Sequence, residues 1–157
     1  GVALRSMKAP GTAYDDPRIG RDPQPAHMDG YVDTADDNGG VHINSGIPNH
    51  AFYLAAVGFG GKAWLKAGKV WYAALTQTLR READFQVAAA ATEEAAGQQF
   101  GNKGAAVVLT AWRRVGIELK GASPKQTKSS KTTTAKAKGA VTGAHSRGAE
   151  RRTRRAS

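Results

Sequence analysis

Residues 46–116 read GIPNHAFYLAAVGFGGKAWLKAGKVWYAALTQTLRREADFQVAAAATEEAAGQQFGNKGAAVVLTAWRRVG, and this stretch decides the fold class. Its apolar residues recur at the three- and four-residue spacing of a helix, and no part of it alternates with the period of a half-buried strand. Glycines and charged pairs interrupt the pattern where helices would end. The stretch therefore predicts a mainly α-helical fold of four helices, with few strands.

The first expected helix begins at Ser45, a suitable N-cap, with Pro48 in the first turn, where the missing N–H costs little. Apolar residues cover nearly every side of this helix between residues 47 and 55, which is typical of a buried helix. The glycines that follow are expected to end it, namely Gly58, Gly60 and Gly61.

Three further helices are expected after the first one. The second carries apolar residues at helical spacing between residues 67 and 79. The third is capped by Asp84 and ends near Gly97. The fourth places one apolar stripe between residues 105 and 112, and it ends at Gly116, a typical residue just past a helix C-terminus.

The sequence before residue 46 is rich in glycine, proline and aspartate, and prolines stand at positions 10, 17, 23 and 25. The residue before a proline is driven out of the helical region, and aspartate favours turns. We expect an ordered but irregular segment that packs on something larger. A linker without fixed structure is the alternative.

Charge is divided unevenly along the chain. Residues 1–119 carry 12 basic and 12 acidic residues, whereas residues 120–157 carry 11 basic residues and Glu150, so the net charge of +10 belongs to the tail. This division disfavours a basic domain built to bind nucleic acid. The tail has almost nothing apolar to bury, so we expect it to be disordered. It is either a solvated extension or a weak electrostatic contact for nucleic acid or an anionic surface.

Composition and the first residues exclude several kinds of protein. The chain has no cysteine, hence no disulfide, thiolate metal site or cysteine nucleophile. No apolar run reaches the roughly 18 residues of a membrane-spanning helix. Residues 1–14, GVALRSMKAPGTAY, contain no initiator methionine, apolar signal core or cleavage site. We therefore expect the chain to be a fragment of a longer protein.

The side chains best suited to catalysis lie in residues 36–46, DDNGGVHINSG. Residues 38–40 permit positive φ and a tight loop, which places His42 on a rigid base just before a helix. Asp37 lies five residues before the histidine, across the turn. Its carboxylate can hydrogen-bond one imidazole nitrogen, which fixes the ring and favours the protonated form. The other nitrogen is then free to donate to a developing oxyanion.

A second cationic donor could come from Arg5, in the sequence Leu4-Arg5-Ser6-Met7. From the residues alone, a purely structural role for these positions remains an alternative to the catalytic one. A histidine before a helix is commonly structural, and Asp-Asn-Gly-Gly commonly serves only as a turn.

Residues 37–54, DNGGVHINSGIPNHAFYL, resemble the most strongly marked segment of the thermolysin-like zinc metallopeptidases. The resemblance covers residues 2–119 in order, through ALRSMKAP, KAGKVWYAALTQTL and AAVVLTAWRRVGI. The short connection GFGGKAWLKAGKVWY is more similar to the protealysin-type branch of the family. The resemblance implies that residues 1–119 are the C-terminal helical domain of such a peptidase and that residues 120–157 are a disordered basic tail.

The resemblance also implies a role for individual residues. His42 matches the histidine that hydrogen-bonds the tetrahedral intermediate and serves as proton donor, and Asp37 matches the aspartate that orients it. Arg5 matches the arginine that contacts the substrate carbonyl or the transition-state oxyanion. Leu4 matches an apolar residue of the pocket for the side chain after the scissile bond, and residues 38–40 match the turn.

The metal-binding part of the family pattern is not present in this sequence. The family needs a His-Glu-x-x-His helix and a further glutamate to hold zinc. No histidine here is followed by glutamate, because the residues after the four histidines are Met28, Ile43, Ala51 and Ser146. The resemblance therefore implies zinc ligands upstream of this chain, none within it, and calcium as a further ion of the complete enzyme. His27, His50 and His145 show no ligand pattern.

These observations predict the C-terminal half of a zinc metalloendopeptidase that acts on peptide or protein substrates and is inactive by itself. Its expected partner is the N-terminal half of the catalytic unit, whereas a membrane and nucleic acid are not expected partners. Secretion is the usual location in the family, and this chain does not give its own. One alternative is a non-catalytic helical module whose basic tail binds nucleic acid or a surface, and another is a truncated product with no folded role.

Overall fold

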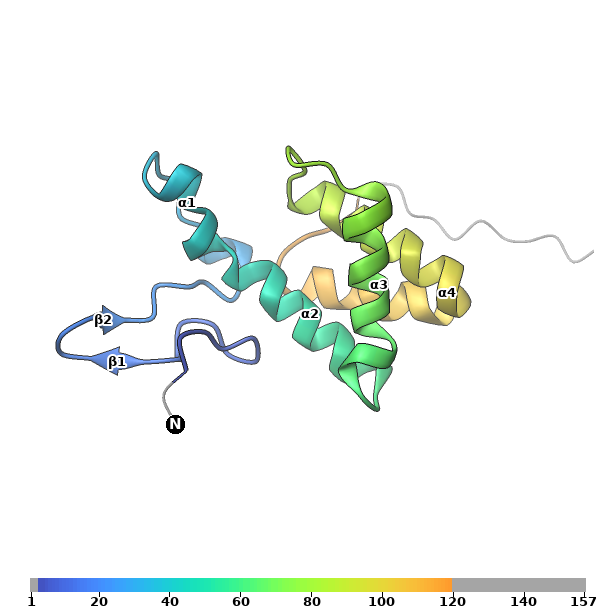
Figure 1. The fold of residues 1–157 in the computed structure, drawn as a ribbon, viewed down its shortest axis with the longest axis horizontal. Coiled ribbons are helices and arrows are strands. Elements are labelled where there is room, and N and C mark those ends of the chain that lie inside the picture. Colours follow the sequence, from blue (N-terminus) through green and yellow to red (C-terminus); the bar gives the residue numbers. More distant parts are fainter. Residues whose placement is uncertain (1–2, 120–157) are drawn as a thin grey trace, which may run out of the picture. The chain divides into compact units, whose positions relative to one another are not determined.

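Helices dominate residues 3–119, the part of the chain that the computed structural model describes. The α-helices are α1 (Asp37–Asn44), α2 (Gly46–Phe59), α3 (Ala67–Ala73) and α4 (Phe85–Arg114), shown in Figure 1. Short helical turns are η1 (Met28–Gly30), η2 (Ala63–Leu65) and η3 (Ala74–Thr78), the last a π-turn that continues α3. The expected mainly helical fold is confirmed, and the predicted basic tail lies outside the described residues.

The segment before α1 is irregular, as its prolines and aspartates predict. It contains one hairpin, in which β1 (Asp15–Asp16) pairs antiparallel with β2 (Gly20–Arg21). The two strands are only two residues long, which agrees with the lack of period-2 alternation in the sequence. Three of its side chains are nevertheless buried, and these are Pro10, Asp22 and Gln24.

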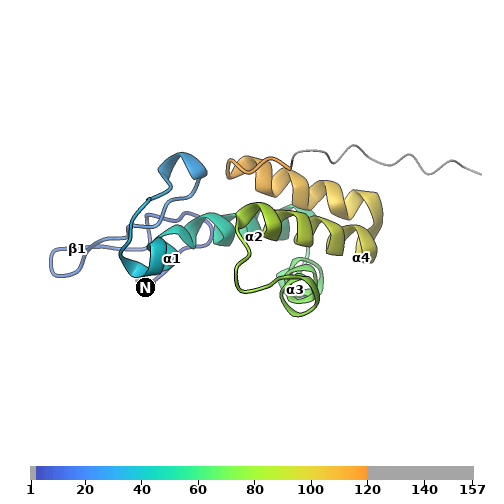
Figure 2. The ribbon, with the colours of Figure 1, turned by 90° about the horizontal axis from the view of Figure 1, so that it is seen from above.

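The core lies where α2, α3 and α4 meet, since α2 packs along α4 and α3 packs against both (Figure 2). Alanines on α2 and α4 let the helices approach closely. Trp112 is the largest fully buried side chain. Its ring stacks on that of Trp71 at a centroid distance of 6.2 Å, and its Nε1–H donates to Thr92 Oγ1 at 2.8 Å.

Helix α2 buries one face rather than all of its sides. Ile47, Ala51 and Ala55 have no exposed surface and form one stripe at helical spacing. Val57 lies on another face and is 61% exposed. Residues 47–55 are all buried or half-buried, as the apolar pattern predicts, and exposed positions occur only after them, near the end of the helix.

Ser45 is not the N-cap that the sequence predicts. Its backbone is helical, with φ −59° and ψ −16°, and its side chain makes no capping bond to α2. The hydroxyl instead donates to the carbonyl of His42 at 2.9 Å. The reason is that α1 leads directly into α2, so the first turn of α2 is already supplied with backbone carbonyls.

The third and fourth expected helices are both present within α4, which consists of two helices on either side of a kink. Asp84 caps it as predicted, because its carboxylate accepts the N–H of Val87 at 2.8 Å. The helix runs past Gly97 and breaks at Gly101, where φ is 66° and ψ is −167°. An alanine-rich helix tolerates a glycine without a break, so Gly97 gives no reliable end signal. No helix within residues 3–119 is long and apolar enough to cross a membrane.

Candidate active site

The backbone before His42 makes a left-handed turn over consecutive residues. Asp37, Asn38, Gly39 and Gly40 have φ values of 55°, 51°, 82° and 70°. Glycine adopts such values freely, and aspartate and asparagine tolerate them better than other residues with a side chain. The predicted tight loop at residues 38–40 is therefore present, and it begins one residue earlier, at Asp37. His42 lies within α1, immediately after the turn.

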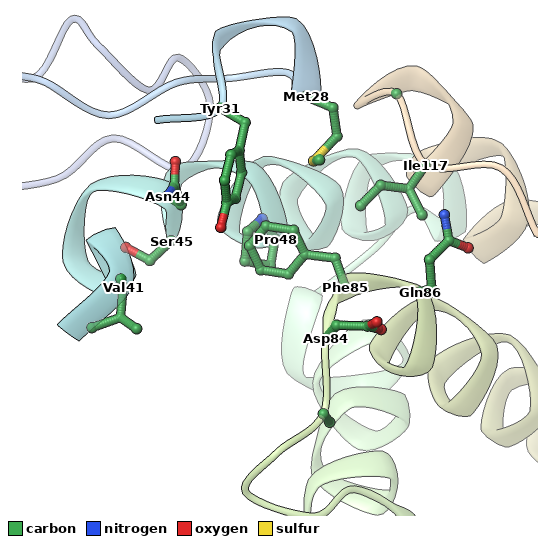
Figure 3. A pocket seen from close by; sticks show the side chains of 13 residues that line it. Met28, Tyr31, Val41, Asn44, Ser45, Pro48, Asp84, Phe85, Gln86 and Ile117 are labelled. Carbon is green, nitrogen blue, oxygen red and sulfur yellow. The ribbon is translucent and has the colours of Figure 1, made fainter. Parts of the chain in front are cut away.

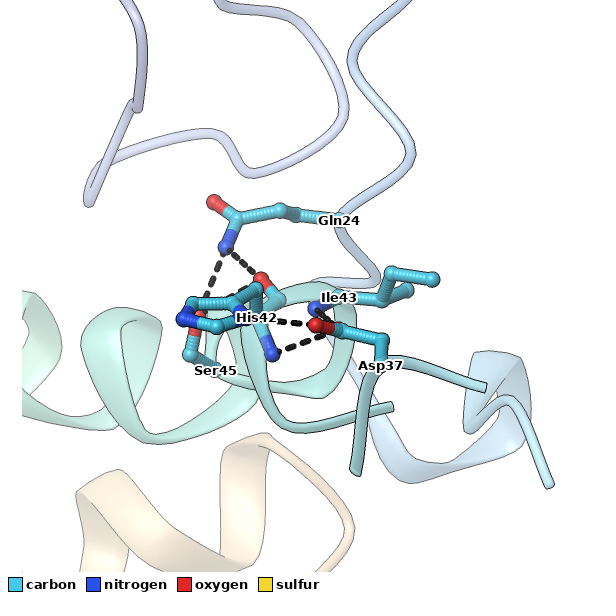
Figure 4. Close-up of polar contacts among 5 residues, drawn as sticks. All are labelled: Gln24, Asp37, His42, Ile43 and Ser45. Atoms are coloured by element: carbon cyan, nitrogen blue, oxygen red, sulfur yellow. Dashed lines mark hydrogen bonds and ion pairs between the residues drawn. The ribbon is translucent and has the colours of Figure 1, made fainter. Parts of the chain in front are cut away.

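Asp37 holds both the ring and the backbone of His42 (Figure 4). His42 Nδ1 donates to Asp37 Oδ1 at 2.5 Å, while Asp37 Oδ2 accepts the N–H of His42 at 2.8 Å and that of Ile43 at 3.2 Å. The carboxylate thus satisfies two backbone donors at the start of a helical turn, where such donors lack partners. The His42 side chain is 74% exposed, and Nε2 is left for a partner outside this set.

The ionisation of Asp37 reflects the same contacts. The hydrogen bond from the His42 ring lowers the pKa of the Asp37 carboxyl below its ordinary value. Desolvation opposes this effect, and the backbone N–H groups of His42 and Ile43 reinforce it. The charged carboxylate is therefore the form that the folded chain stabilises.

We expect Asp37→Asn to destabilise the 157-residue chain in a manner that depends on pH. Because the folded-state pKa of Asp37 lies below the unfolded value of about 3.9, its contribution is complete above about pH 5 and disappears as the pH falls through the folded pKa. Urea unfolding of both proteins at several pH values measures the difference. The difference should shrink below about pH 4, and a gap that is the same at every acidic pH would contradict this account.

Arg5 and Leu4 lie on the segment before β1 and are exposed. Arg5 Nη1 donates to the carbonyl of Leu4 at 3.0 Å, and the Leu4 side chain is 70% exposed. Within residues 3–119, no hydrogen bond or ion pair joins Arg5 to Asp37 or His42. The structure therefore brings together Asp37 and His42 directly, and it leaves Arg5 and Leu4 on a separate segment.

A groove of about 500 Å³ lies between the junction of α1 and α2 and the start of α4 (Figure 3), and neither Asp37 nor His42 lines it. Its walls are largely apolar and include Met28, Tyr31, Phe85 and Ile117. Val41 and Ser45 contribute to the lining, so the groove adjoins the turn of α1 that carries His42. The part of the chain that the structure describes contains no cluster of three or more histidine, cysteine, aspartate or glutamate side chains able to hold a metal.

Residues 1–117 match the family described as "Thermolysin metallopeptidase, alpha-helical domain". The match includes almost all of the described part of the chain and contains the whole of the candidate site. The chain belongs to the thermolysin metallopeptidase family. Enzymes of this family are metalloendopeptidases that act on peptides or proteins, and the resemblance read from the sequence is confirmed.

Individual relatives place the chain near the protealysin-type branch. It is 53% identical over 121 residues to an extracellular metalloprotease of Pectobacterium carotovorum subsp. carotovorum, covering 76% of this chain and 35% of the relative. It is 49% identical over 123 residues to protease PrtS of Photorhabdus sp. (strain Az29), covering 76% and 33%. The solved precursor of protealysin, a metalloproteinase from Serratia proteamaculans, matches with a TM-score of 0.70 and 57% identity, over 73% of this chain and 36% of that one.

This member of the thermolysin metallopeptidase family spans about a third of the length of these relatives. Thermolysin-like peptidases use zinc, and calcium is a further ion of the complete enzymes. Neither ion has a ligand cluster within residues 3–119. The comparison therefore agrees with a chain that carries the helical domain of such an enzyme.

One residue near the site is not predicted by the sequence. Gln24 lies 18 residues before His42, and its Nε2 donates to the His42 carbonyl at 2.8 Å and to Ser45 Oγ at 2.7 Å (Figure 4). The sequence Asp22-Pro23-Gln24-Pro25 gives only a turn signal. No periodic pattern could reveal this contact, because it joins an irregular segment to a helix.

Proposed function

We propose that this chain is the helical half of a zinc metalloendopeptidase and that His42 stabilises the transition state of peptide-bond hydrolysis. The observation that carries the proposal is the bond between Asp37 and His42 in a chain of this family. The carboxylate fixes the imidazole by its Nδ1 side, and the ring is exposed on a rigid turn. This geometry suits a donor that must meet a substrate held by another part of the enzyme.

The chemistry assigned to the chain is the stabilisation of negative charge. When a nucleophile adds to a peptide carbonyl, the oxygen becomes an oxyanion. His42 Nε2 is proposed to donate a hydrogen bond or a proton to it, while Asp37 keeps the ring oriented. Arg5 is proposed as the second cationic donor to the substrate carbonyl, and Leu4 as part of the apolar pocket for the side chain after the scissile bond. The roles of Arg5 and Leu4 rest on the family pattern in the sequence.

Zinc is proposed to be held by residues outside this chain. No histidine-glutamate pair occurs in the sequence, and the described residues form no ligand cluster. The chain's own residues therefore do not fit a zinc site, and no step of the reaction on this chain is assigned to the metal. Four of the relatives have names that begin with the word extracellular, which supports secretion of the parent enzyme as part of the same proposal.

The partner that we propose is the remainder of the catalytic unit. We propose that this partner docks on an apolar groove of about 270 Å³ in this chain, where α2 and α3 meet. The groove is lined by Met7, Phe52, Trp71, Leu75 and Leu79, among others. Leu75 is 63% exposed and Met7 is 40% exposed. An apolar surface of this kind is unusual on an isolated domain. Since the chain spans about a third of its relatives, a much longer polypeptide exists in those enzymes to cover it.

The purified 157-residue chain is expected to hydrolyse no peptide bonds, with or without added zinc, because its sequence has no His-Glu-x-x-His motif to hold the metal that activates water. The measurement is hydrolysis of a casein or quenched-peptide substrate in the presence of zinc and after treatment with a chelator. The control is a complete peptidase in which this chain supplies the helical domain, which should be active. A chelator-sensitive activity that follows the 157-residue chain through every purification step would overturn the prediction.

A further inference from the structure

The irregular segment before α1 is fastened to the residue that carries the proposed chemistry. Gln24 is 3% exposed, and both N–H groups of its amide are used: one donates to the carbonyl of His42 at 2.8 Å and the other to Ser45 Oγ at 2.7 Å. Ser45 Oγ in turn donates to the same His42 carbonyl at 2.9 Å. The three groups form a closed set of hydrogen bonds around one carbonyl oxygen.

Gln24 is itself held by a second buried polar side chain. Asp22 is also 3% exposed, and its Oδ1 accepts the N–H of Gln24 at 3.1 Å. Its Oδ2 accepts the N–H groups of Gly11 and Ala13, at 2.9 and 3.1 Å. Asp22 therefore connects Gly11 and Ala13, on the segment that follows Arg5, to Gln24, which donates to the His42 carbonyl. Charge-assisted bonds to backbone N–H groups are stronger than neutral ones, so this anchor is firm.

The buried amide carries a cost that packing does not explain. Gln24 Oε1 is buried and has no hydrogen-bond partner among the residues that the structure describes. A buried acceptor without a partner destabilises a fold, and an apolar side chain of the same size would avoid that cost. The amide is therefore best accounted for by what its N–H groups do, which is to hold the carbonyl of His42.

Asp37 and Gln24 form hydrogen bonds with different parts of His42. Asp37 binds the ring and the backbone N–H, and Gln24 binds the backbone carbonyl (Figure 4). Because the His42 side chain is 74% exposed, packing contributes little to its position. We propose that Gln24 is a positioning residue, which fixes the backbone of His42 against the segment that carries Arg5 so that both donors meet one oxyanion. This inference rests on the proposed function of His42.

The test uses a complete peptidase in which this chain supplies the helical domain, with Gln24→Met as the variant. Methionine has a similar length and no N–H group. The matched control is Val108→Ala, which removes buried side-chain volume from the core on α4 and lines neither of the two grooves described above. Both variants should lower the melting temperature. Gln24→Met should also lower kcat about tenfold with KM within twofold, because small displacements of a catalytic group reduce turnover sharply, whereas Val108→Ala should leave kcat unchanged.

Three outcomes distinguish the positioning role of Gln24 from the proposed function of His42. If Gln24→Met changes kcat no more than Val108→Ala at an equal loss of melting temperature, the positioning role is wrong. If His42→Ala, measured beside them, keeps full kcat, the proposed function of His42 fails, and the positioning role fails with it. If His42→Ala loses activity and Gln24→Met loses kcat beyond the control, both stand.

A milder variant covers the case in which Gln24→Met does not fold. Ser45→Ala removes one member of the hydrogen-bonded set and places a favourable helix residue in a position that is already helical. It should lower kcat about threefold at unchanged KM, since one of the bonds to the His42 carbonyl is lost. An unchanged kcat in Ser45→Ala would overturn the proposal.

Discussion

Replacing His42 by alanine in a complete peptidase that contains this chain should lower kcat by about 100- to 1000-fold and change KM little. The reason is that the hydrogen bond from Nε2 becomes strong only when the substrate oxygen carries negative charge, so its loss is felt in the transition state and not in substrate binding. Steady-state kinetics with a peptide substrate at fixed zinc concentration measure both constants.

The chain offers a matched control for this experiment in a second histidine. His50 lies on α2, is half-buried, and its Nδ1 contacts the carbonyl of Ala26 at 3.1 Å. His50→Ala removes the same kind of side chain without touching Asp37 or His42, so kcat should stay near the wild-type value. Normal turnover in His42→Ala together with a lowered melting temperature would show that His42 is structural, and an equal loss of kcat in both variants would show that the effect is not specific.

Local signals in the sequence predict the left-handed turn and the N-cap of α4 well. Asp84 stands before an apolar periodic stretch and caps α4, as its residue type and place indicate. Residues 38–40 form the left-handed turn that asparagine and glycine permit. The contact between Asp37 and His42 follows from the same turn, because five residues that reverse direction bring the two side chains together. These features depend on neighbours in sequence, and the residues themselves are enough to predict them.

Features that depend on distant residues are not predicted in the same way. Serine is a common N-cap residue, and Ser45 directly precedes α2. Because α1 leads into α2 without a gap, its hydroxyl donates to the His42 carbonyl instead of capping α2. Gln24 reaches that carbonyl across 18 residues from a segment with no periodic pattern. Val57, near the end of α2, is exposed although the apolar composition of the helix favours burial. In each case tertiary packing decides the outcome, and local propensity does not.

Gly46→Ala is expected to destabilise the 157-residue chain by about 1–3 kcal/mol, although alanine is the better helix residue. Gly46 lies at the start of α2 under the segment that holds Gln24. A β-carbon there would overlap the carbonyl oxygen of Pro25 and would stand 2.8 Å from Cβ of Gln24. The nearer of these atoms belongs to the backbone and cannot rotate away, so the segment must move as a whole. Urea unfolding followed by circular dichroism gives the free energy of unfolding.

The same substitution at Gly97 should have the opposite sign. Gly97 lies inside α4, and an added β-carbon would meet Ala105 Cβ at 3.7 Å, an ordinary van der Waals contact. Gly97→Ala should therefore stabilise the chain by up to about 1 kcal/mol, the usual gain of alanine over glycine in a helix. Glycine-to-alanine exchange raises helix propensity at both positions. The difference between the two changes in the free energy of unfolding therefore reports the close approach of the Gln24 segment to α2. If both substitutions stabilised the chain, the segment would not be packed on α2 as described, and the route by which Gln24 holds His42 would be lost with it.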